Sequence, residues 1–593
     1  YFVYIIHELM TIRMKKFLHH KKFNTLTLVS MLLPVVFFMI YLLTSCNRHK
    51  KPAGKEIVNT AEQMDPKVKE LIKISLSYTI SNNGQLNDST RLTEDSTLNF
   101  LYTQNEFVPF WCSAEKWKPQ ADSLFKFIAQ AKLYGLFPSD YHFSQLKKIW
   151  NMILADSITR DIKSDAALWT RAELMLSDAL VTIFKHLKLG RLPSDSITLR
   201  RDPVVSKEFI KLKFNEIRDG GSLVSVIESL EPTHKGYHEL KAGIKNFLEK
   251  ADFSQVSTIK YPDKNQENLK ASVVKRLFES GYIDSTTIAL DSIELSKILL
   301  KFQKERRLTP DGKIGPQTIR ELNSSDREKF IRIAITMDRY KMLPEEMPEI
   351  YIWVNIPSYS MGLYNRKSLI VSGRIVVGRP QTRTPVLTSS IYEMVTYPQW
   401  TIPQSIIVKE ILPSLKKDPG YLARKGYSLF DSKGEETDPF SVDWSKYNKG
   451  IPFRVIQGSG DANALGVLKF NFYNKYAVYL HDTNQRFYFG LDSRALSHGC
   501  VRVQEWQKVA FFIMENEMNY SMKNKKRYVP VDSLKHWLKV KEKHIISLND
   551  RIPVYIRYYT CEGLNGRVVF YEDIYNEDRD LEEFLFKTKY ILI

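Results

Sequence analysis

The chain has 593 residues, a formal net charge of +19 and 43% hydrophobic residues. Its length suggests about three or four domains, and its composition excludes wholesale disorder, collagen-like repeats and a polytopic membrane protein. Four cysteines are too few for a disulfide-rich scaffold of this size. The positive charge indicates either an anionic partner, such as nucleic acid, a membrane surface or an acidic polymer, or a lysine-rich solvated surface.

The N-terminal residues have the pattern of an export signal. Met14 is the expected start, because lysines at positions 15, 16, 21 and 22 follow it, and residues 26–43 are almost wholly apolar. Cys46 directly after small polar residues resembles the bacterial lipoprotein signal, in which this cysteine is lipidated. We therefore expect a signal segment at 1–46 and a membrane-anchored chain that faces the periplasm in the bacterial cell envelope. An uncleaved transmembrane anchor is the alternative.

The next residues are predicted to be helical. Residues 47–65 are polar and lysine-rich, which is typical of a tether. Residues 66–255 favour a helical scaffold domain, and the apolar residues within 176–187 recur on one helix face. Trp111 and Tyr141 are predicted to be core residues rather than ligand platforms. No constellation of chemically reactive residues stands out here.

Residues 268–323 predict a small helical module. Leu295 and Phe302 belong to one apolar helix face. The turn-rich loop 308–316 leads into a short second helix that ends near Asn323. This string resembles the peptidoglycan-binding repeat of bacterial wall enzymes. The resemblance implies wall binding, although such modules also serve as spacers.

From residue 350 the hydrophobic pattern changes to the two-residue period of strands. Leu468, Phe470 and Phe472 fall on one face, and a later strand places His481 at its end. Residues 404–464 are rich in Lys, Gly and Pro, and they predict an insertion that caps the sheet. Strands are predicted at 351–356, 369–377, 467–472, 476–481, 553–559 and 567–571, a helical piece at 406–415, and a catalytic unit over 350–577.

The sharpest motif is Ser-His-Gly-Cys-Val-Arg at 497–502, with His481 nineteen positions before Cys500. A free thiol with a pKa of ~8.5 is mostly protonated at neutral pH, so a nucleophilic cysteine needs a base or a positive field. His481 is the candidate base. Gly499 lets the backbone come close, so that its N–H and that of Cys500 form an oxyanion hole. Arg502 adds a bidentate cation suited to a substrate carboxylate.

This pattern resembles the L,D-transpeptidase catalytic domain, whose signature pairs an upstream histidine with Ser/Thr-His-Gly-Cys. The resemblance implies that Cys500 is the nucleophile, that His481 is the general base, and that Ser497, His498, Gly499 and Arg502 shape the site or contact substrate. One departure is Tyr473, where proline is usual. Runs similar to the large, scaffold-bearing branch of the family extend the resemblance over residues 70–577, at Val354–Pro357, Val376–Pro380, Thr384–Pro385, Ile411–Pro413, Pro419–Leu422, Asn463–Gly466, Lys469–Phe470 and Tyr479–Thr483.

The resemblance implies a multidomain α+β chain with a helical scaffold, a peptidoglycan-binding module and a mainly β catalytic domain with a capping insertion. It also implies a reaction without a cofactor. The thiolate attacks the L-centre–D-Ala bond of a donor stem peptide, a thioester forms, and an amine of an acceptor stem resolves it as a 3→3 cross-link. Water as the acceptor would make the protein an L,D-carboxypeptidase.

Several alternatives remain open at this stage. Cys500, His481 and His498 are a possible zinc ligand set, although no CxxC or HExxH spacing supports it. Cys112 and Cys561 form either a disulfide or, as we favour, separate core thiols. A non-catalytic lipoprotein that anchors the envelope to the wall would not need both Cys500 and His481. Nucleic-acid binding is disfavoured by the export signal and by the lack of a basic-aromatic motif.

Overall fold

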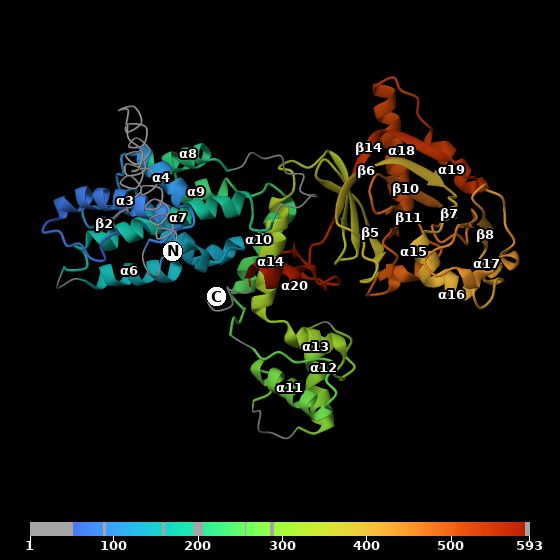
Figure 1. Cartoon of the computed structure of the whole chain (residues 1–593), viewed down its shortest axis with the longest axis horizontal. Helices are drawn as coiled ribbons and strands as arrows, with labels where there is room; N and C mark the ends of the chain where they lie inside the picture. The colour runs from blue at the N-terminus through green and yellow to red at the C-terminus, as the bar shows by residue number, and fades with distance from the viewer. Residues whose placement is uncertain are drawn as a thin grey trace, which may run out of the picture. The chain divides into compact units, whose positions relative to one another are not determined.

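The computed structural model describes residues 51–86, 90–156, 160–193, 205–254, 256–284, 290–306 and 308–586 (Figure 1). The predicted signal segment with Cys46 lies outside these ranges. None of the helices within them is long and apolar enough to cross a bilayer. The chain divides into two compact units, Tyr1–Ala121 with Leu146–Asp178 and Asp122–Gln145 with Ala179–Ile593.

The first unit is helical, as predicted, and it is built around a buried carboxylate. Glu173 is fully buried and accepts hydrogen bonds from the Tyr102 hydroxyl (2.7 Å) and the Trp111 backbone N–H (2.9 Å). Trp111 is also fully buried, which confirms its prediction as a core residue. The elements that lie in or extend into this unit are α3 (Met64–Ser81), α4 (Asp95–Gln104), β1 (Cys112–Ser113), β2 (Lys116–Trp117), α5 (Pro119–Ala129), α6 (Phe143–Ala155) and α7 (Ala166–Lys188).

Two of the four cysteines are buried thiols with separate partners. The Cys112 sulfur lies 3.5 Å from Glu173 Oε2, and the Cys561 sulfur lies 3.3 Å from Thr336 Oγ1. Both cysteines are free. The preference for core thiols over a disulfide is therefore confirmed.

The helices of the second unit surround a buried charge cluster on α14. Tyr141 is fully buried and its hydroxyl lies 2.9 Å from His186 Nδ1, so its predicted place in the core is confirmed. Asp338 Oδ2 lies 2.9 Å from Arg191 Nε, and its Oδ1 lies 2.8 Å from Lys341 Nζ. The helices are α8 (Lys207–Arg218), α9 (Leu223–Glu228), α10 (Lys235–Leu248) and α14 (Asp326–Lys341).

Residues 259–323 form a helical cluster with its own apolar core, which includes Leu295, Leu299 and Phe302. The loop before its last helix is held by a buried amide: Gln303 Oε1 accepts from the Gly312 N–H (2.8 Å), and Gln303 Nε2 donates to Asp311 Oδ1 (2.9 Å). The loop conformation is thus fixed from inside the cluster. Its helices are α11 (Gln266–Glu279), α12 (Ser292–Glu305) and α13 (Pro316–Asn323).

The C-terminal part is β-rich, as predicted. Among the described residues, nine strands form one sheet in the order β12-β5-β13-β11-β10-β6-β14-β3-β4, and β4 also pairs with β5, so the sheet closes on itself. Helices α18 and α19 accompany it (Figure 1). The elements are β3 (Ile350–Asn355), β4 (Ser360–Asn365), β5 (Ser368–Gly378), β6 (Leu387–Thr396), β10 (Leu468–Phe472), β11 (Leu480–His481), β12 (Ala495–Ser497), β13 (Val501–Val503), α18 (Trp506–Lys523), α19 (Val531–Val540) and β14 (Ile545–Arg557).

The prediction of a strand over 476–481 is wrong in extent, because only Leu480 and His481 pair as a strand. The Asn474 side chain accepts hydrogen bonds from the Tyr476 and Val478 N–H groups, both at 3.0 Å. This local turn competes with strand pairing. The predicted alternation of Leu468, Phe470 and Phe472 is confirmed, since all three are buried.

Residues between β6 and β10 form a small layer with its own apolar core, and the helical piece predicted at 406–415 is present. Its three-stranded sheet has the order β7-β9-β8. The labels α15, α16, α17, β7 and β8 mark this layer in Figure 1. Its elements are β7 (Trp400–Thr401), α15 (Gln404–Ile406), a π-helical turn (Ile407–Ile411), α16 (Leu412–Leu415), α17 (Tyr421–Arg424), β8 (Tyr427–Phe430) and β9 (Arg454–Gln457).

The buried charge cluster of α14 predicts a large loss of stability when its anion is removed. Burial raises the pKa of Asp338, but Arg191 and Lys341 outweigh that effect and bring the pKa to about 2. Because this pKa lies below the ordinary value of about 3.9, the stabilisation is complete above about pH 4 and is lost as the pH falls toward 2. Asp338→Ala removes the buried anion that faces two buried cations, which should lower the free energy of unfolding by about 3–5 kcal/mol.

Urea unfolding at pH 7 measures this loss. The matched control is Asp532→Ala, which removes a largely exposed carboxylate paired with Lys535 and should change the free energy of unfolding by less than about 0.5 kcal/mol. Equal stabilities of the two variants would contradict this account of the cluster.

Candidate active site

Strand pairing places three basic side chains in one row. Lys469 on β10 pairs with His481 on β11, and His481 pairs with Arg502 on β13. Residues that are direct partners on adjacent strands project to the same face of a sheet. Their neighbours Leu480 and Val501 are buried in the apolar core. The row therefore lies on the face opposite the core.

Cys500 lies just before β13, beside this row. Cys500 is partly exposed, and its sulfur is 3.9 Å from the Ala477 carbonyl oxygen. The Val501 N–H donates to the Tyr479 carbonyl (3.1 Å), which places Tyr479 next to Cys500 on the adjacent chain segment. Burial raises the pKa of the Cys500 thiol, and hydrogen bonds from Tyr479 and the charges of Lys469 and Arg502 offset only part of that effect. The resting sulfur is therefore a thiol at neutral pH.

His481 is buried and neutral. Only 3% of its surface is exposed, and burial, Arg502 and Lys469 lower its pKa to about 3. Its Nδ1 has no hydrogen-bond partner among the described residues. A neutral imidazole with an unused ring nitrogen is able to accept a proton, so the side chain has the state that a general base requires.

The Ser497 hydroxyl braces the loop that carries Cys500. It donates to the Cys500 carbonyl (2.6 Å) and accepts from the Gly499 N–H (3.1 Å). Gly499 has φ +120°, a conformation that L side chains rarely adopt. The expectation that the Gly499 N–H is free for an oxyanion hole is therefore wrong in this conformation, because Ser497 already engages it. The Cys500 N–H is left as the candidate donor from this loop.

Arg502 contacts one polar and one aromatic side chain. Its Nη1 donates to Gln485 Oε1 (2.7 Å), and its guanidinium carbon lies 5.4 Å from the centre of the Tyr488 ring. Its Nε is buried without a hydrogen-bond partner in the described part of the chain. A buried unpaired donor is costly, so this atom is suited to an oxygen of a bound molecule.

His498 points to the layer between β6 and β10 rather than to the row. Glu410 Oε1, on the π-helical turn of that layer, lies 2.5 Å from His498 Nε2 and 3.1 Å from Arg379 Nη2. Burial raises the pKa of Glu410, but His498 and Arg379 together hold it below its usual range. Glu410 thus joins the inserted layer to the loop that carries Cys500.

The structure places Ser497, Gly499 and Cys500 on one hydrogen-bonded loop before β13, and it pairs Arg502 of β13 with His481 of β11. Sequence reasoning did not single out Lys469, Tyr479 or Glu410 as site residues. The strand alternation offered a signal for Lys469, because Leu468 and Phe470 on either side of it were predicted to face the core. Glu410 carried no such signal, since its partner His498 is 88 positions away.

A metal-binding arrangement is not seen at this site. No group of three or more His, Cys, Asp or Glu side chains within the described ranges is placed to hold a metal ion. His498 instead contacts Glu410 and Arg379. The zinc alternative therefore gains no support from the arrangement of these side chains.

Comparisons with known proteins match two parts of the chain to known domain families. Residues 349–526 match the YkuD family model, described as the L,D-transpeptidase catalytic domain, and residues 96–243 match that of the scaffold domain. A Haemophilus influenzae protein named "Putative L,D-transpeptidase" is 33% identical over 297 residues, which are 49% of this chain and 58% of that protein. The chain thus spans little more than half the length of this relative.

Solved structures of L,D-transpeptidases are more distantly similar to this chain. An L,D-transpeptidase from Mycobacterium smegmatis is 11% identical, with a TM-score of 0.17, over 35% of this chain and 58% of that one. The catalytic domain of an L,D-transpeptidase from E. faecium, acylated by ertapenem, is 12% identical, with a TM-score of 0.16, over 36% of this chain and 99% of that one. The sequence matches, and not these likenesses, carry the domain assignment.

The neutral state of His481 predicts the rate at which Cys500 is acylated and how that rate depends on pH. His481→Ala should slow acylation of Cys500 by a β-lactam by about 10²–10⁴-fold, because the thiol loses its proton acceptor. The wild-type rate should show no inflection near pH 6.5, the ordinary histidine pKa, because the pKa of His481 is about 3. Stopped-flow acylation between pH 5 and 8 measures both effects.

His498→Ala is the matched control, since it removes the other histidine of the motif but leaves the row of Lys469, His481 and Arg502 in place. If His498→Ala abolishes acylation and His481→Ala does not, the base has been assigned to the wrong histidine.

Proposed function

We propose that this chain, in which a match to the L,D-transpeptidase catalytic domain follows a match to the scaffold domain, is a cysteine-dependent peptidoglycan L,D-transpeptidase that forms 3→3 cross-links. The observation that supports this most is the position of Cys500 beside the row of Lys469, His481 and Arg502. A nucleophile, a neutral base and two cations then share one face of the sheet.

In the proposed acylation step, Cys500 Sγ attacks the carbonyl carbon of the L-centre–D-Ala bond in a donor stem peptide. The thiol proton passes to His481, and the Cys500 N–H donates to the oxygen that becomes negative. The carbon–nitrogen bond then breaks, and D-Ala leaves with the proton from His481 on its amine. Arg502 and Lys469 favour the negatively charged groups of the substrate, including carboxylates of the stem.

In the second step, an amine of an acceptor stem attacks the thioester carbon. The new amide bond forms, the carbon–sulfur bond breaks, and the proton released by the amine returns the sulfur to a thiol by way of His481. Water in place of the amine would release a tripeptide, which is the carboxypeptidase outcome. The choice between these products depends on how well water is excluded from the thioester.

The other parts of the chain have supporting roles in this proposal. The cluster at 268–323 binds peptidoglycan through its loop, whose conformation Gln303 fixes from inside. The layer at 404–464 caps the site, because Glu410 contacts His498 next to Cys500. Lipidation of Cys46 holds the chain on an envelope membrane, facing the periplasm. The positive net charge suits an anionic wall polymer.

The direct test of the proposed reaction uses purified disaccharide-tetrapeptides. We expect the wild-type protein to form dimers with a 3→3 linkage, identified by mass spectrometry, and Cys500→Ala to form none while keeping its fold, because the substitution replaces one small side chain by another. Cys500→Ser, which keeps a weaker nucleophile of similar size, is the control variant. Dimer formation by Cys500→Ala would show that the nucleophile lies elsewhere.

The contact between Glu410 and His498 predicts a shift of products. Replacement of 404–464 by a short Gly/Ser linker, or the milder Glu410→Ala, should still allow acylation of Cys500 by a small β-lactam, since neither removes the row. Both changes should move the product from cross-linked dimer toward hydrolysed tripeptide, several-fold for Glu410→Ala, because water reaches the thioester.

The dimer-to-tripeptide ratio on purified muropeptides measures this shift. Glu435→Ala, an exposed acid in the same layer, is the control and should leave the ratio unchanged. An unchanged ratio in both the linker variant and Glu410→Ala would mean that the layer is not a cap.

A further inference from the structure

The C-terminal segment that follows β14 returns to the loop that carries Cys500. It comprises β15 (Cys561–Leu564), β16 (Arg567–Phe570) and α20 (Glu577–Leu581), and it lies beyond residue 526, where the match to the catalytic domain ends. Tyr575, between β16 and α20, is fully buried. A buried tyrosine hydroxyl needs hydrogen-bond partners, and this one contacts Gly378 and Thr384, of which Thr384 is hydrogen-bonded to the loop that carries Cys500.

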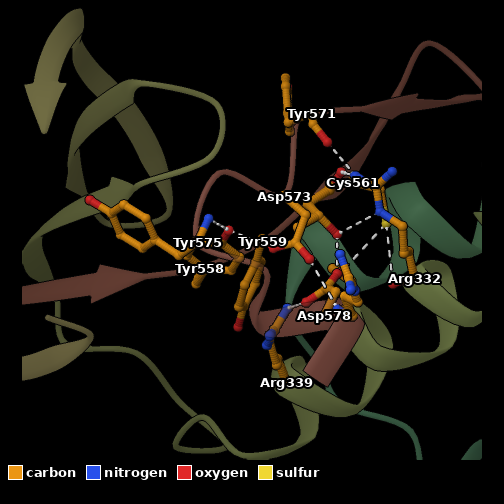
Figure 2. A network of polar contacts seen from close by, with 12 residues as sticks. Arg332, Arg339, Tyr558, Tyr559, Cys561, Tyr571, Asp573, Tyr575 and Asp578 are labelled. Atoms are coloured by element: carbon orange, nitrogen blue, oxygen red, sulfur yellow. Dashed lines mark hydrogen bonds and ion pairs between the residues drawn. The ribbon is translucent and has the colours of Figure 1, made fainter. Parts of the chain in front are cut away.

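Helix α14 fixes this segment in place. Figure 2 shows Arg332 and Arg339 reaching from α14 to it. Arg332 Nη2 donates to the carbonyls of Thr560 (3.1 Å) and Tyr571, and Arg339 Nη1 lies 2.5 Å from Asp578 Oδ1. Asp578 is 1% exposed, so this ion pair is buried, and the loss of either partner would leave the other charge uncompensated.

Tyr558 orients the backbone of Tyr575. Its hydroxyl accepts from the Tyr575 N–H (2.8 Å) and donates to Asp573 Oδ1 (2.6 Å), as the dashed lines of Figure 2 mark. This hydrogen bond fixes the backbone position from which the Tyr575 side chain extends. Its own hydroxyl donates to the Gly378 carbonyl (2.6 Å) and accepts from the Thr384 N–H (3.1 Å).

Thr384 passes this restraint to the loop of Cys500. It is 1% exposed, and its Oγ1 accepts from the Gly378 N–H (2.8 Å) and donates to the Gly499 carbonyl (2.8 Å). The Gly499 carbonyl belongs to the peptide group whose N–H is that of Cys500. A hydrogen bond to this carbonyl therefore sets the direction of the Cys500 N–H.

We propose that Tyr575 is a positioning residue for the reaction at Cys500, which it reaches through Thr384 and the peptide group between Gly499 and Cys500. This inference rests on the proposed function. Without the Tyr575 hydroxyl, the Gly378 carbonyl and the Thr384 N–H lose a buried partner, and the loop relaxes. A small displacement of the Cys500 N–H weakens the oxyanion stabilisation while the surface that binds substrate stays intact.

The test uses Tyr575→Phe in the full chain, with acylation of Cys500 by a carbapenem resolved into a binding constant and a first-order acylation rate. We expect the first-order rate to fall by about 10–100-fold and the binding constant to change by less than about two-fold. Tyr571→Phe is the matched control, because the Tyr571 hydroxyl donates to Glu562 (2.9 Å) in the same segment. It lies outside the relay, by which we mean the hydrogen bonds from Tyr575 through Thr384 to the Gly499 carbonyl. This variant should react at the wild-type rate.

Two variants of Thr384 supply a rescue that a merely structural role would not give. Thr384→Ser keeps the oxygen that bridges Gly378 and Gly499 and should stay within a few-fold of the wild-type rate. Thr384→Val has nearly the same shape without that oxygen and should lose rate as Tyr575→Phe does. If Tyr575→Phe does not fold, this pair decides the question. Wild-type first-order rates for Tyr575→Phe or Thr384→Val would overturn the inference.

A readout without acylation separates this inference from the proposed function. Backbone amide hydrogen exchange of residues 497–501 should be faster in Tyr575→Phe than in Tyr571→Phe, because the relay that restrains the loop is broken. If the wild-type protein is not acylated, the proposed function fails, and the exchange rates still decide whether the relay exists. Equal exchange in the two variants would overturn the relay itself.

Discussion

The site depends on one short strand that is paired on both sides. Strand β11 has only Leu480 and His481, yet it joins β10 to β13 and so brings Lys469, His481 and Arg502 into one row. Because side chains alternate along a strand, a slip of one residue would turn His481 into the core and Leu480 toward the site. Asp482 opposes such a slip, since its carboxylate accepts hydrogen bonds from the Val467 N–H (3.0 Å) and Arg486 Nη2 (2.8 Å).

Burial, together with the charges of this row, sets the protonation states. Burial favours the neutral forms of His481 and Cys500, while Arg502 and Lys469 disfavour a further positive charge on His481 and favour a negative one on Cys500. The resting pair is therefore a neutral thiol beside a neutral imidazole, not an ion pair. A carboxylate bound at Arg502 would cancel part of the positive field and raise the pKa of His481. The base would then be strongest when a donor stem is in place, which links substrate binding to the ionisation of Cys500.

Sequence reasoning predicted the elements whose patterns are local. The alternation of β10, the helix that begins at Pro316 and the buried Trp111 all follow from spacing and residue type within a few positions. The short extent of β11 could not be predicted in this way, because the Asn474 side chain competes with strand pairing only in the folded turn. The engagement of the Gly499 N–H by Ser497 likewise depends on a backbone conformation, φ +120° at Gly499, that the motif alone does not state.

The supporting residues of the site could not be predicted from the sequence for a different reason. Glu410 reaches His498 across 88 positions, and Tyr575 reaches Gly378 across 197. Single-sequence patterns describe neighbours along the chain, whereas these contacts arise from the pairing order of the sheet and from the return of the C-terminal segment. Cys500 and His481 could be found because their chemistry is concentrated in short motifs.

The claim that Cys500 is the nucleophile is tested most directly by mass spectrometry of the intact protein and its peptides after exposure to a carbapenem. We expect a single covalent adduct on the peptide that contains Cys500. The peptides that contain Cys112 or Cys561 should carry none, because these sulfurs are buried and contact Glu173 and Thr336. No adduct, or an adduct on a different residue, would contradict it.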